Sequence, residues 1–129
     1  MNLKKSKIAV LLALTCMCIP GCAGNNYTKD SFPGYILVGG NSSGESLYMD
    51  RANIDKTGEY RTAWFITTTG SGDYLTYYLQ FDCHMNKYKR LHLWHYADNG
   101  KAKSYKGEED WAYPIFGTWY EIMFNQACK

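Results

Sequence analysis

Apolar and polar side chains alternate most regularly between Tyr74 and Cys83. The odd positions of this stretch are apolar or aromatic, whereas Thr76, Gln80 and Asp82 make the even positions lean polar. A period of two residues predicts a half-buried β-strand. The last apolar position of the strand is a cysteine, so the strand also offers an attachment point for a covalent link.

Further extended segments lie on both sides of this strand. They are expected at 35–38, 46–50, 59–69, 88–98 and 102–105, with a last extended segment at 111–116 and a helical turn or bend at 52–56. The segment 59–69 carries Trp64, Phe65 and Ile66 in succession, so both of its faces bear bulk and a central place in a sheet is favoured. Turn sequences at 70–73 and 98–101, the second containing Asn-Gly, predict hairpins.

A helical pattern follows near the end of the chain. Apolar residues recur at helical spacing at Trp119, Ile122, Met123 and Ala127. Thr118 stands three residues before Glu121, which is the spacing of a capping box, so the helix is expected to begin here. Cys128 falls in the last turn of this helix.

The first 21 residues predict an export signal. Three lysines precede a twelve-residue, largely apolar run from Ile8 to Ile19, and small residues follow it. A run of this length is shorter than the roughly 20 apolar residues that a membrane-spanning helix needs. We therefore expect residues 1–21 to be a signal peptide of the lipoprotein type.

Two processing routes are open at the end of this leader. Residues 19–22, Ile-Pro-Gly-Cys, resemble a bacterial lipobox, which predicts acylation of Cys22, although its proline departs from the usual pattern. Cleavage after Ala23 by the ordinary signal peptidase is the alternative, and it would give a secreted or periplasmic protein. On the first route, residues 22–34 form the lipidated cysteine and a tether, and residues 35–129 form the folded domain.

Removal of the leader changes the charge of the chain. The whole sequence has 14 Lys and Arg against 12 Asp and Glu, a formal net charge of +2. Three of the lysines and none of the acids precede residue 22, so the mature charge is about −1. The net positive charge was the only feature of the whole chain that favoured nucleic-acid binding, so no nucleic-acid partner is expected.

Removal of the leader also decides which cysteines can pair. The two leader cysteines are lost, and Cys22 is either lipidated or part of the tether. In an oxidising compartment, Cys83 and Cys128 then form a disulfide by default. Such a bridge would close a loop of about 46 residues and stabilise the fold by about 4 kcal/mol. The alternative, Cys83 and His84 as metal ligands, lacks a second close pair at ligand spacing.

No constellation in the sequence predicts catalysis. His92 and His95 are three apart on an expected strand and so point to opposite faces. The sequence contains neither a Gly-x-Ser-x-Gly elbow nor a His-Glu-x-x-His motif. The acidic run at 108–110 is typical of a solvated loop. We therefore expect no enzymatic activity, no cofactor and no metal site.

The hairpin region 84–106 is the strongest candidate for contact with a partner. It holds one acid, Asp98, and six basic residues, Lys87, Lys89, Arg90, Lys101, Lys103 and Lys106, with aromatic residues interleaved. Tyrosine, tryptophan and arginine supply rigid contact area at protein and glycan interfaces. The expected partner-binding residues are Lys87, Tyr88, Lys89, Arg90, His92 and Trp94. The structural alternative is that the lysines protect an edge hairpin from pairing while the aromatic residues belong to the core.

A further set of residues has the order and spacing of a known family. They are Tyr48, Asp50, Trp64, Asp82, Cys83, Tyr96, Trp111, Pro114, Ile115, Gly117, Thr118, Glu121 and Cys128. Together they resemble the surface-adhesin protein E family of Gram-negative bacteria, over about residues 35–129. The most specific part is the Asp-Cys pair followed some 45 residues later by a helix-borne cysteine.

This resemblance implies an α+β fold, in which a twisted antiparallel β-sheet of about six strands carries a C-terminal helix fastened by the disulfide. It also implies a lipoprotein held in outer-membrane lipid through a palmitate on Cys22, a virulence factor that binds host extracellular-matrix proteins. The exposed edge strands would allow a homodimer. The alternative function is a periplasm-facing lipoprotein that binds a small ligand or an envelope partner without catalysis.

Overall fold

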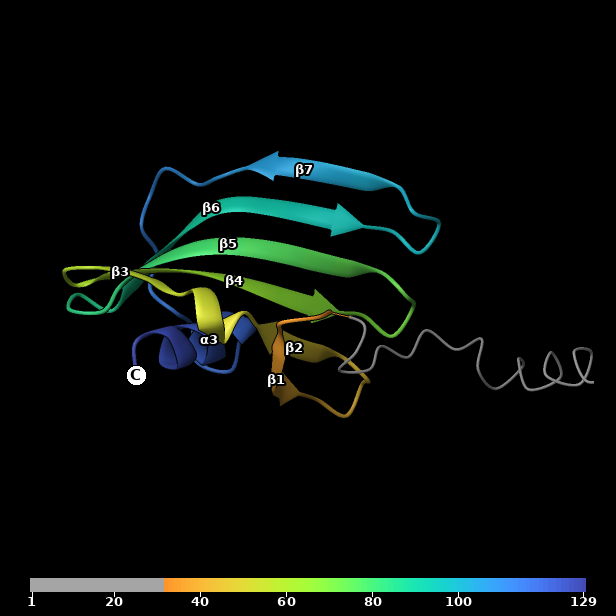
Figure 1. Cartoon of the computed structure of the whole chain (residues 1–129), viewed down its shortest axis with the longest axis horizontal. Helices are drawn as coiled ribbons and strands as arrows, with labels where there is room; N and C mark the ends of the chain where they lie inside the picture. The colour runs from red at the N-terminus through yellow and green to blue at the C-terminus, as the bar shows by residue number, and fades with distance from the viewer. Residues whose placement is uncertain (1–31) are drawn as a thin grey trace, which may run out of the picture.

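The computed structural model describes residues 32–129, which form one seven-stranded antiparallel sheet with a helix packed against it (Figure 1). In chain order the elements are β1 (Ile36–Gly40), β2 (Ser46–Met49), the 3-10 helix η1 (Arg51–Asn53), β3 (Asp55–Thr57), β4 (Tyr60–Thr68), β5 (Tyr74–Asp82), β6 (Lys87–Tyr96), β7 (Ala102–Lys106) and α3 (Trp119–Ala127). The predicted signal peptide, the predicted lipidation site Cys22 and most of the predicted tether lie outside the described residues.

Strand β4 lies in the interior of the sheet, as its consecutive bulky residues predicted. The strand order is β1-β2-β4-β5-β6-β7, and β3 also pairs with β4. Strand β2 pairs with residues 65–68 of β4, whereas β3 pairs with residues 60–62 of the same edge. Because two short strands share this edge, β4 has neighbours along most of its length.

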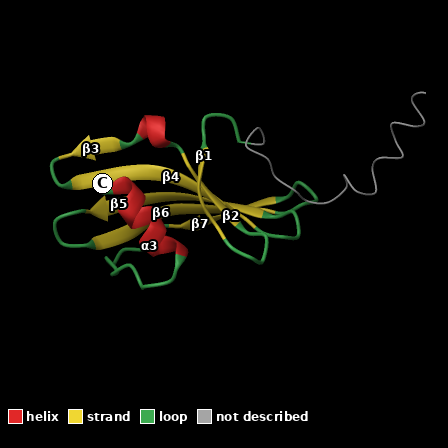
Figure 2. Cartoon of the chain, turned by 90° about the horizontal axis from the view of Figure 1, so that it is seen from below, coloured by secondary structure: helices red, strands yellow, loops and turns green. Residues whose placement is uncertain are grey.

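The main core lies between the sheet and α3, which crosses one face of the strands (Figure 2). Its buried residues are Leu47, Met49, Ala63, Phe65, Leu79, Phe81, Met123 and Ala127. Leu79 and Phe81 are odd-numbered positions of β5, so the prediction that the odd positions of this strand face the core is confirmed. Each fully buried side chain of this kind stabilises the fold by about 1.5–3 kcal/mol. No helix within residues 32–129 is long and apolar enough to cross a membrane.

A disulfide fastens the end of α3 to the end of β5. Cys83 directly follows β5, Cys128 caps the C-terminus of the helix, and their Cα atoms are 5.5 Å apart. Both cysteines are partly buried against the main core. The predicted pairing and the predicted fold class, an antiparallel sheet with a disulfide-fastened C-terminal helix, are therefore confirmed.

The segment 52–56, expected as a helical turn or bend, divides into two elements. Residues 51–53 form η1, and residues 55–57 form β3, the additional strand of the sheet. Gly58 has a φ of +61°, and this left-handed conformation lets β3 turn back onto β4 at once. The sequence pattern did not predict this β3–β4 hairpin, because all three residues of β3 are exposed and show no alternation of apolar and polar positions.

Residues 111–116, expected as a last extended segment in which Pro114 argues against a central strand, form no strand of the sheet. Only Ala112 pairs with the sheet, exchanging hydrogen bonds of 2.8 and 2.9 Å with Tyr88. Pro114 has no N–H to continue the ladder. The Ile115 carbonyl instead accepts hydrogen bonds from the backbone N–H and the hydroxyl of Thr118.

The start of α3 was placed correctly, but its capping box was not. Thr118 is the N-cap residue, yet its hydroxyl makes no cap hydrogen bond and donates to Ile115 at 2.7 Å instead. Glu121 reaches back with its carboxylate and accepts the backbone N–H of Gly117 at 3.2 Å. In a capping box this carboxylate would accept the backbone N–H of the N-cap residue Thr118, so the observed hydrogen bond lies one residue earlier in the chain.

Candidate functional site

The sheet divides the predicted partner-binding residues between its two faces. We call the face that carries α3 the helix face and the opposite one the open face. Tyr88 and Arg90 are cross-strand partners of the core residues Phe81 and Leu79, so both lie on the helix face. Lys87, Lys89, His92 and Trp94 occupy the open face.

A β-bulge in β6 causes this division. Residues 87–90 pair in regular order with 82–79 of β5, but His92, not Leu91, is the partner of Tyr78. Leu91 is the extra residue, which reverses the alternation after it. Without the bulge, Arg90 and His92 would share a face.

Four stacked rings form the centre of the open face, and we call them the ring cluster: Trp64, Tyr78, His92 and Trp94. The Trp64 ring stacks on Tyr78 with centroids 4.4 Å apart and on Trp94 at 5.6 Å. The His92 ring stacks on Trp94 at 3.7 Å. All four side chains are half-buried. They come from three neighbouring strands, β4, β5 and β6, so the cluster is a shallow aromatic surface on a rigid sheet.

Basic side chains and further rings border this cluster towards the β5–β6 turn. The Lys89 ammonium lies 4.8 Å from the centroid of Trp111, and Lys87 lies 5.9 Å from that of Tyr113. The Trp111 ring also stacks on Tyr60 of β4 at 5.9 Å. Cation–π contacts at exposed sites contribute about 0.5–1 kcal/mol, so these contacts help to orient the two half-buried lysines.

The open face carries more positive than negative charge. Lys106 of β7 is the cross-strand partner of His92 and adds a third lysine to this face. Two acids occupy its strand positions. The carboxylate of Asp82 accepts the backbone N–H groups of His84 and Met85 at 3.1 and 3.0 Å, and Asp55 of β3 is the cross-strand partner of Thr62. Arg90, on the helix face, pairs with Glu108 at 3.1 Å.

The other end of the open face is covered by the first described residues. Phe32 is buried and packs edge-on to Tyr74 and tilted to Tyr48, with centroids 5.2 Å apart in both cases. Tyr74 in turn stacks on Tyr96 at 4.7 Å. This end is therefore a small second core, and the accessible rings lie nearer the β5–β6 turn.

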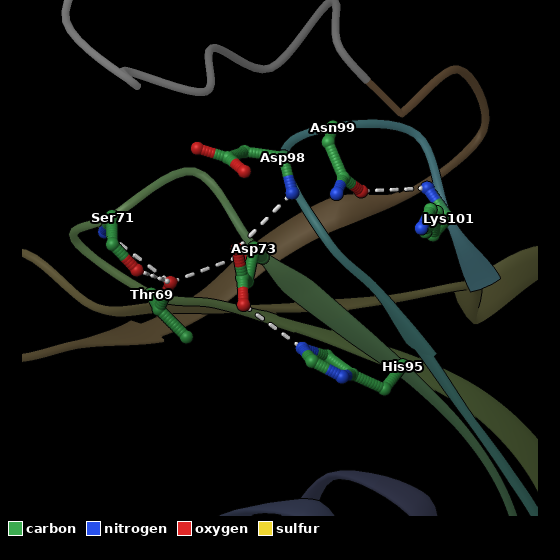
Figure 3. A network of polar contacts seen from close by, with 7 residues as sticks. All are labelled: Thr69, Ser71, Asp73, His95, Asp98, Asn99 and Lys101. Atoms are coloured by element: carbon green, nitrogen blue, oxygen red, sulfur yellow. Dashed lines mark hydrogen bonds and ion pairs between the residues drawn. The ribbon is translucent and has the colours of Figure 1, made fainter. Parts of the chain in front are cut away.

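A polar network joins the two hairpin turns beside this second core (Figure 3). One carboxylate oxygen of Asp73 lies 2.9 Å from the His95 ring, and the other accepts the backbone N–H of Asp98 at 3.1 Å. The Asp73 carbonyl accepts the Thr69 hydroxyl at 3.1 Å. One carboxylate thus ties the β4–β5 turn to the β6–β7 turn and aligns the strands that carry the ring cluster.

The helix face contains a separate cleft of about 620 Å³ near the start of α3. Its aromatic lining residues are Tyr77, Tyr88, Trp119 and Tyr120. Burial raises the pKa of Tyr77 above its usual 10.0, and Thr67 donates to its hydroxyl at 3.4 Å. Burial also raises the pKa of Tyr88, whose ring stacks on Tyr120 at 4.5 Å. Both phenols are therefore neutral at physiological pH.

A short apolar loop projects beside this cleft. Tyr113, Ile115 and Phe116 are 65, 68 and 89% exposed. The Tyr88–Ala112 bridge and the hydrogen bonds from Thr118 to Ile115 hold its two ends. The loop is therefore a fixed projection of apolar side chains.

The histidines do not converge within the described part of the chain. His84 lies in the β5–β6 turn, His92 belongs to the ring cluster, and His95 contacts Asp73. The register places His92 and His95 on opposite faces, as their spacing predicted. Residues 32–129 contain no group of three or more His, Cys, Asp or Glu that could hold a metal ion.

Sequence reasoning missed Trp64, Tyr78 and Trp111 as part of the candidate surface. Trp64 and Tyr78 are cross-strand partners, and they meet the ring of Trp94 only through the register of three strands. Trp111 approaches Lys89 because residues 108–112 continue along the edge of β6. The local signal available for these residues was their aromatic character at even-numbered strand positions and in the loop after β7.

These features define a class of protein: a disulfide-braced sheet domain that presents an aromatic and basic surface suited to binding. The family model for surface-adhesin protein E matches residues 35–129, and the chain therefore belongs to this family. Family membership indicates a surface adhesin, located at the cell surface, that binds host surface molecules. No curated protein and no solved structure matches the chain.

Proposed function

We propose that this chain is a lipid-anchored surface adhesin that binds a host extracellular-matrix protein through the basic and aromatic hairpin β6–β7. The observation that carries the proposal is the open face, where Lys87, Lys89, His92 and Trp94 lie together with Trp64 and Tyr78. Aromatic rings held by stacking lose little conformational entropy when a partner binds. Surrounding lysines attract an acidic partner and raise its association rate.

The bulge in β6 reduces the number of residues expected to contact the partner. Lys87 and Lys89 belong to the open face, whereas Arg90 is paired with Glu108 behind it. The expected contact set is therefore smaller than the six residues predicted from the sequence. Tyr88 and Arg90 lie on the helix face, where Tyr88 stacks on Tyr120, so their substitution would disturb packing as well as binding.

Charge reversal tests this proposal in a plate assay with immobilised matrix proteins. The double variant Lys87→Glu/Lys89→Glu should bind more weakly than the unchanged protein, and the difference should be larger at low salt. Lys101→Glu/Lys103→Glu is a matched control, since it makes the same charge change on the same hairpin away from the ring cluster. Equal binding by the unchanged protein and the open-face variant would remove this surface from consideration.

The anchor and the orientation need separate tests, because both depend on residues before 32. Metabolic labelling with palmitate should mark the unchanged chain and not a Cys22→Ser variant. Protease treatment of intact cells should cleave a surface-exposed protein. A protein that is cleaved only after the outer membrane is permeabilised would not be an adhesin.

The second candidate function is a periplasm-facing lipoprotein that binds a small ligand. The cleft of about 620 Å³ beside α3 favours it, because its size and aromatic lining are those of small-molecule sites. Protection from protease on intact cells would favour this alternative. Loss of matrix binding in the open-face variant would favour the adhesin.

A further inference from the structure

The open face has the chemistry of a surface for a chain of sugar rings. The rings of Trp64, Tyr78 and Trp94 are half-buried and fixed by stacking, so their flat faces cover one another and their edges remain for a ligand. The edge of an aromatic ring carries positive potential, which attracts the hydroxyl oxygens of a sugar and, more strongly, an anionic sulfate. Proteins with one solvated sheet face usually place polar residues there, so a ring cluster in this position points to a ligand.

The positions of the lysines specify the charge of that ligand. Lys89 lies one cross-strand row before the ring cluster, and Lys106 lies beside it as the partner of His92. Successive rows on one face are about 7 Å apart, and neighbouring strands are about 4.8 Å apart. Lys89 and Lys106 therefore border the rings on two sides, within one cross-strand row or one strand of them.

Neutral polar residues fill the positions between the rings and the lysines. Thr62, Gln80, Thr76 and Ser104 share the open face. They offer hydroxyl and amide groups that can donate to or accept from sugar hydroxyls. Three lysines of this face stand against two acids at its strand positions: Asp82, whose carboxylate accepts two backbone N–H groups of the β5–β6 turn, and Asp55 of β3. The local charge is therefore positive although the mature chain is about −1.

We infer that the open face binds a sulfated polysaccharide chain of the glycosaminoglycan type. Its sugar rings would lie on the ring cluster, and its sulfate groups would meet Lys87, Lys89 and Lys106. This inference rests on the proposed function and names the chemical group of the host matrix that the surface recognises. An acidic protein surface and a neutral glycan are the other occupants that the experiment distinguishes.

The test is a titration of the full chain with heparin fragments of defined length, followed by tryptophan fluorescence. The matched probe is the same fragment after chemical removal of its sulfates. Sulfated fragments should bind, and removal of sulfate should weaken binding by at least about tenfold. Raising the salt concentration should weaken binding of the sulfated fragment as well.

Two matched double variants locate the contact. Lys89→Ala/Lys106→Ala should weaken binding of the sulfated fragment about tenfold, since each surface charge contributes up to about 1 kcal/mol. Lys101→Ala/Lys103→Ala removes the same charge and should stay within about twofold of the unchanged protein. Neither change removes a buried side chain, and urea unfolding checks that each variant is folded.

Three results would overturn the inference: no binding of sulfated fragments by the unchanged protein, equal binding of the desulfated probe, or equal losses in both double variants. The matrix-binding assay is repeated on matrix proteins from which heparin lyase has removed the glycan chains. This repeat distinguishes failure of the glycan inference from failure of the proposed function. Binding that persists on stripped matrix, and still depends on Lys87 and Lys89, would show a protein ligand and overturn the glycan inference alone. Heparin binding without any matrix binding would overturn the proposed function alone.

Discussion

The bridge between Cys83 and Cys128 gives a sharply testable stability prediction. Replacing either cysteine with alanine should destabilise the fold by nearly the same amount, and the double variant should be no less stable than either single one. The reason is that each change opens the same covalent loop. Both sulfur atoms are partly buried against the core, so the lost packing adds a smaller, residue-specific part.

The expected magnitude follows from the length of that loop. The two cysteines are 45 residues apart in sequence. In the chain-entropy relation, a loop of about 46 residues corresponds to about 4 kcal/mol at 25 °C. Small domains are stable by about 5–15 kcal/mol, so opening the bridge should leave a marginally folded protein.

Equilibrium unfolding in urea, followed by tryptophan fluorescence, measures this loss. The single variants are kept under reducing conditions so that their remaining thiol forms no bond with another chain. The unchanged protein, reduced with dithiothreitol, should match the double variant. Its m-value should also rise on reduction, because the opened unfolded chain exposes more surface. Strictly additive losses in the two single variants, or no effect of the reductant, would refute the reasoning.

Three further predictions concern single positions. Gly107→Ala should destabilise the fold by about 1–3 kcal/mol, measured by urea unfolding, because the added methyl would lie 2.4 Å from a backbone carbonyl oxygen of β6. Gly70→Ala is the control, since the nearest atom there would be 3.5 Å from the methyl, and equal losses in the two variants would contradict the packing argument. Burial raises the pKa of Tyr77, so the folded state holds the phenol proton more tightly and stability should fall as the pH rises above about 10. Tyr77→Phe should lose less stability than the unchanged protein between about pH 9 and 11, and parallel curves would exclude this phenol as the cause. Asp73→Ala should speed hydrogen exchange at the Asp98 amide about tenfold by removing its acceptor, and an unchanged rate would mean that the two turns are not coupled.

The parts of the fold that the sequence predicts are those that depend on short-range patterns. Alternation from Tyr74 to Cys83 identified β5 and its buried face, and three consecutive bulky residues placed β4 inside the sheet. Asn-Gly at 99–100 marked the β6–β7 hairpin, where Gly100 has a φ of +88°. The predicted leader and tether account for the other three cysteines, which left Cys83 and Cys128 as the expected pair, and that pairing is confirmed.

The arrangement of the candidate site could not be predicted, because it depends on registers between strands. A strict period of two places Arg90 and His92 on the same face, and one bulged residue, Leu91, separates them. The ring cluster needs Trp64 and Trp94, 30 positions apart, to meet across β5. Local sequence signals carry no information about which strands are neighbours, and the rings of different strands meet only through that order and the registers between the strands.

The position of the disulfide has a mechanical consequence. The bridge encloses residues 83–128, and the hairpin from Lys87 to Lys106 lies entirely within that loop. A pull between the N-terminal side of the domain and a ligand on the open face would first strain the short ladders of β1 and β2, which lie outside the loop. While the bridge is intact, about 150 Å of chain between the cysteines cannot be drawn out. The part of the proposed surface on β6 and β7 would thus stay within the closed loop under a load that has already detached the first two strands, whereas Trp64 and Tyr78 lie outside that loop.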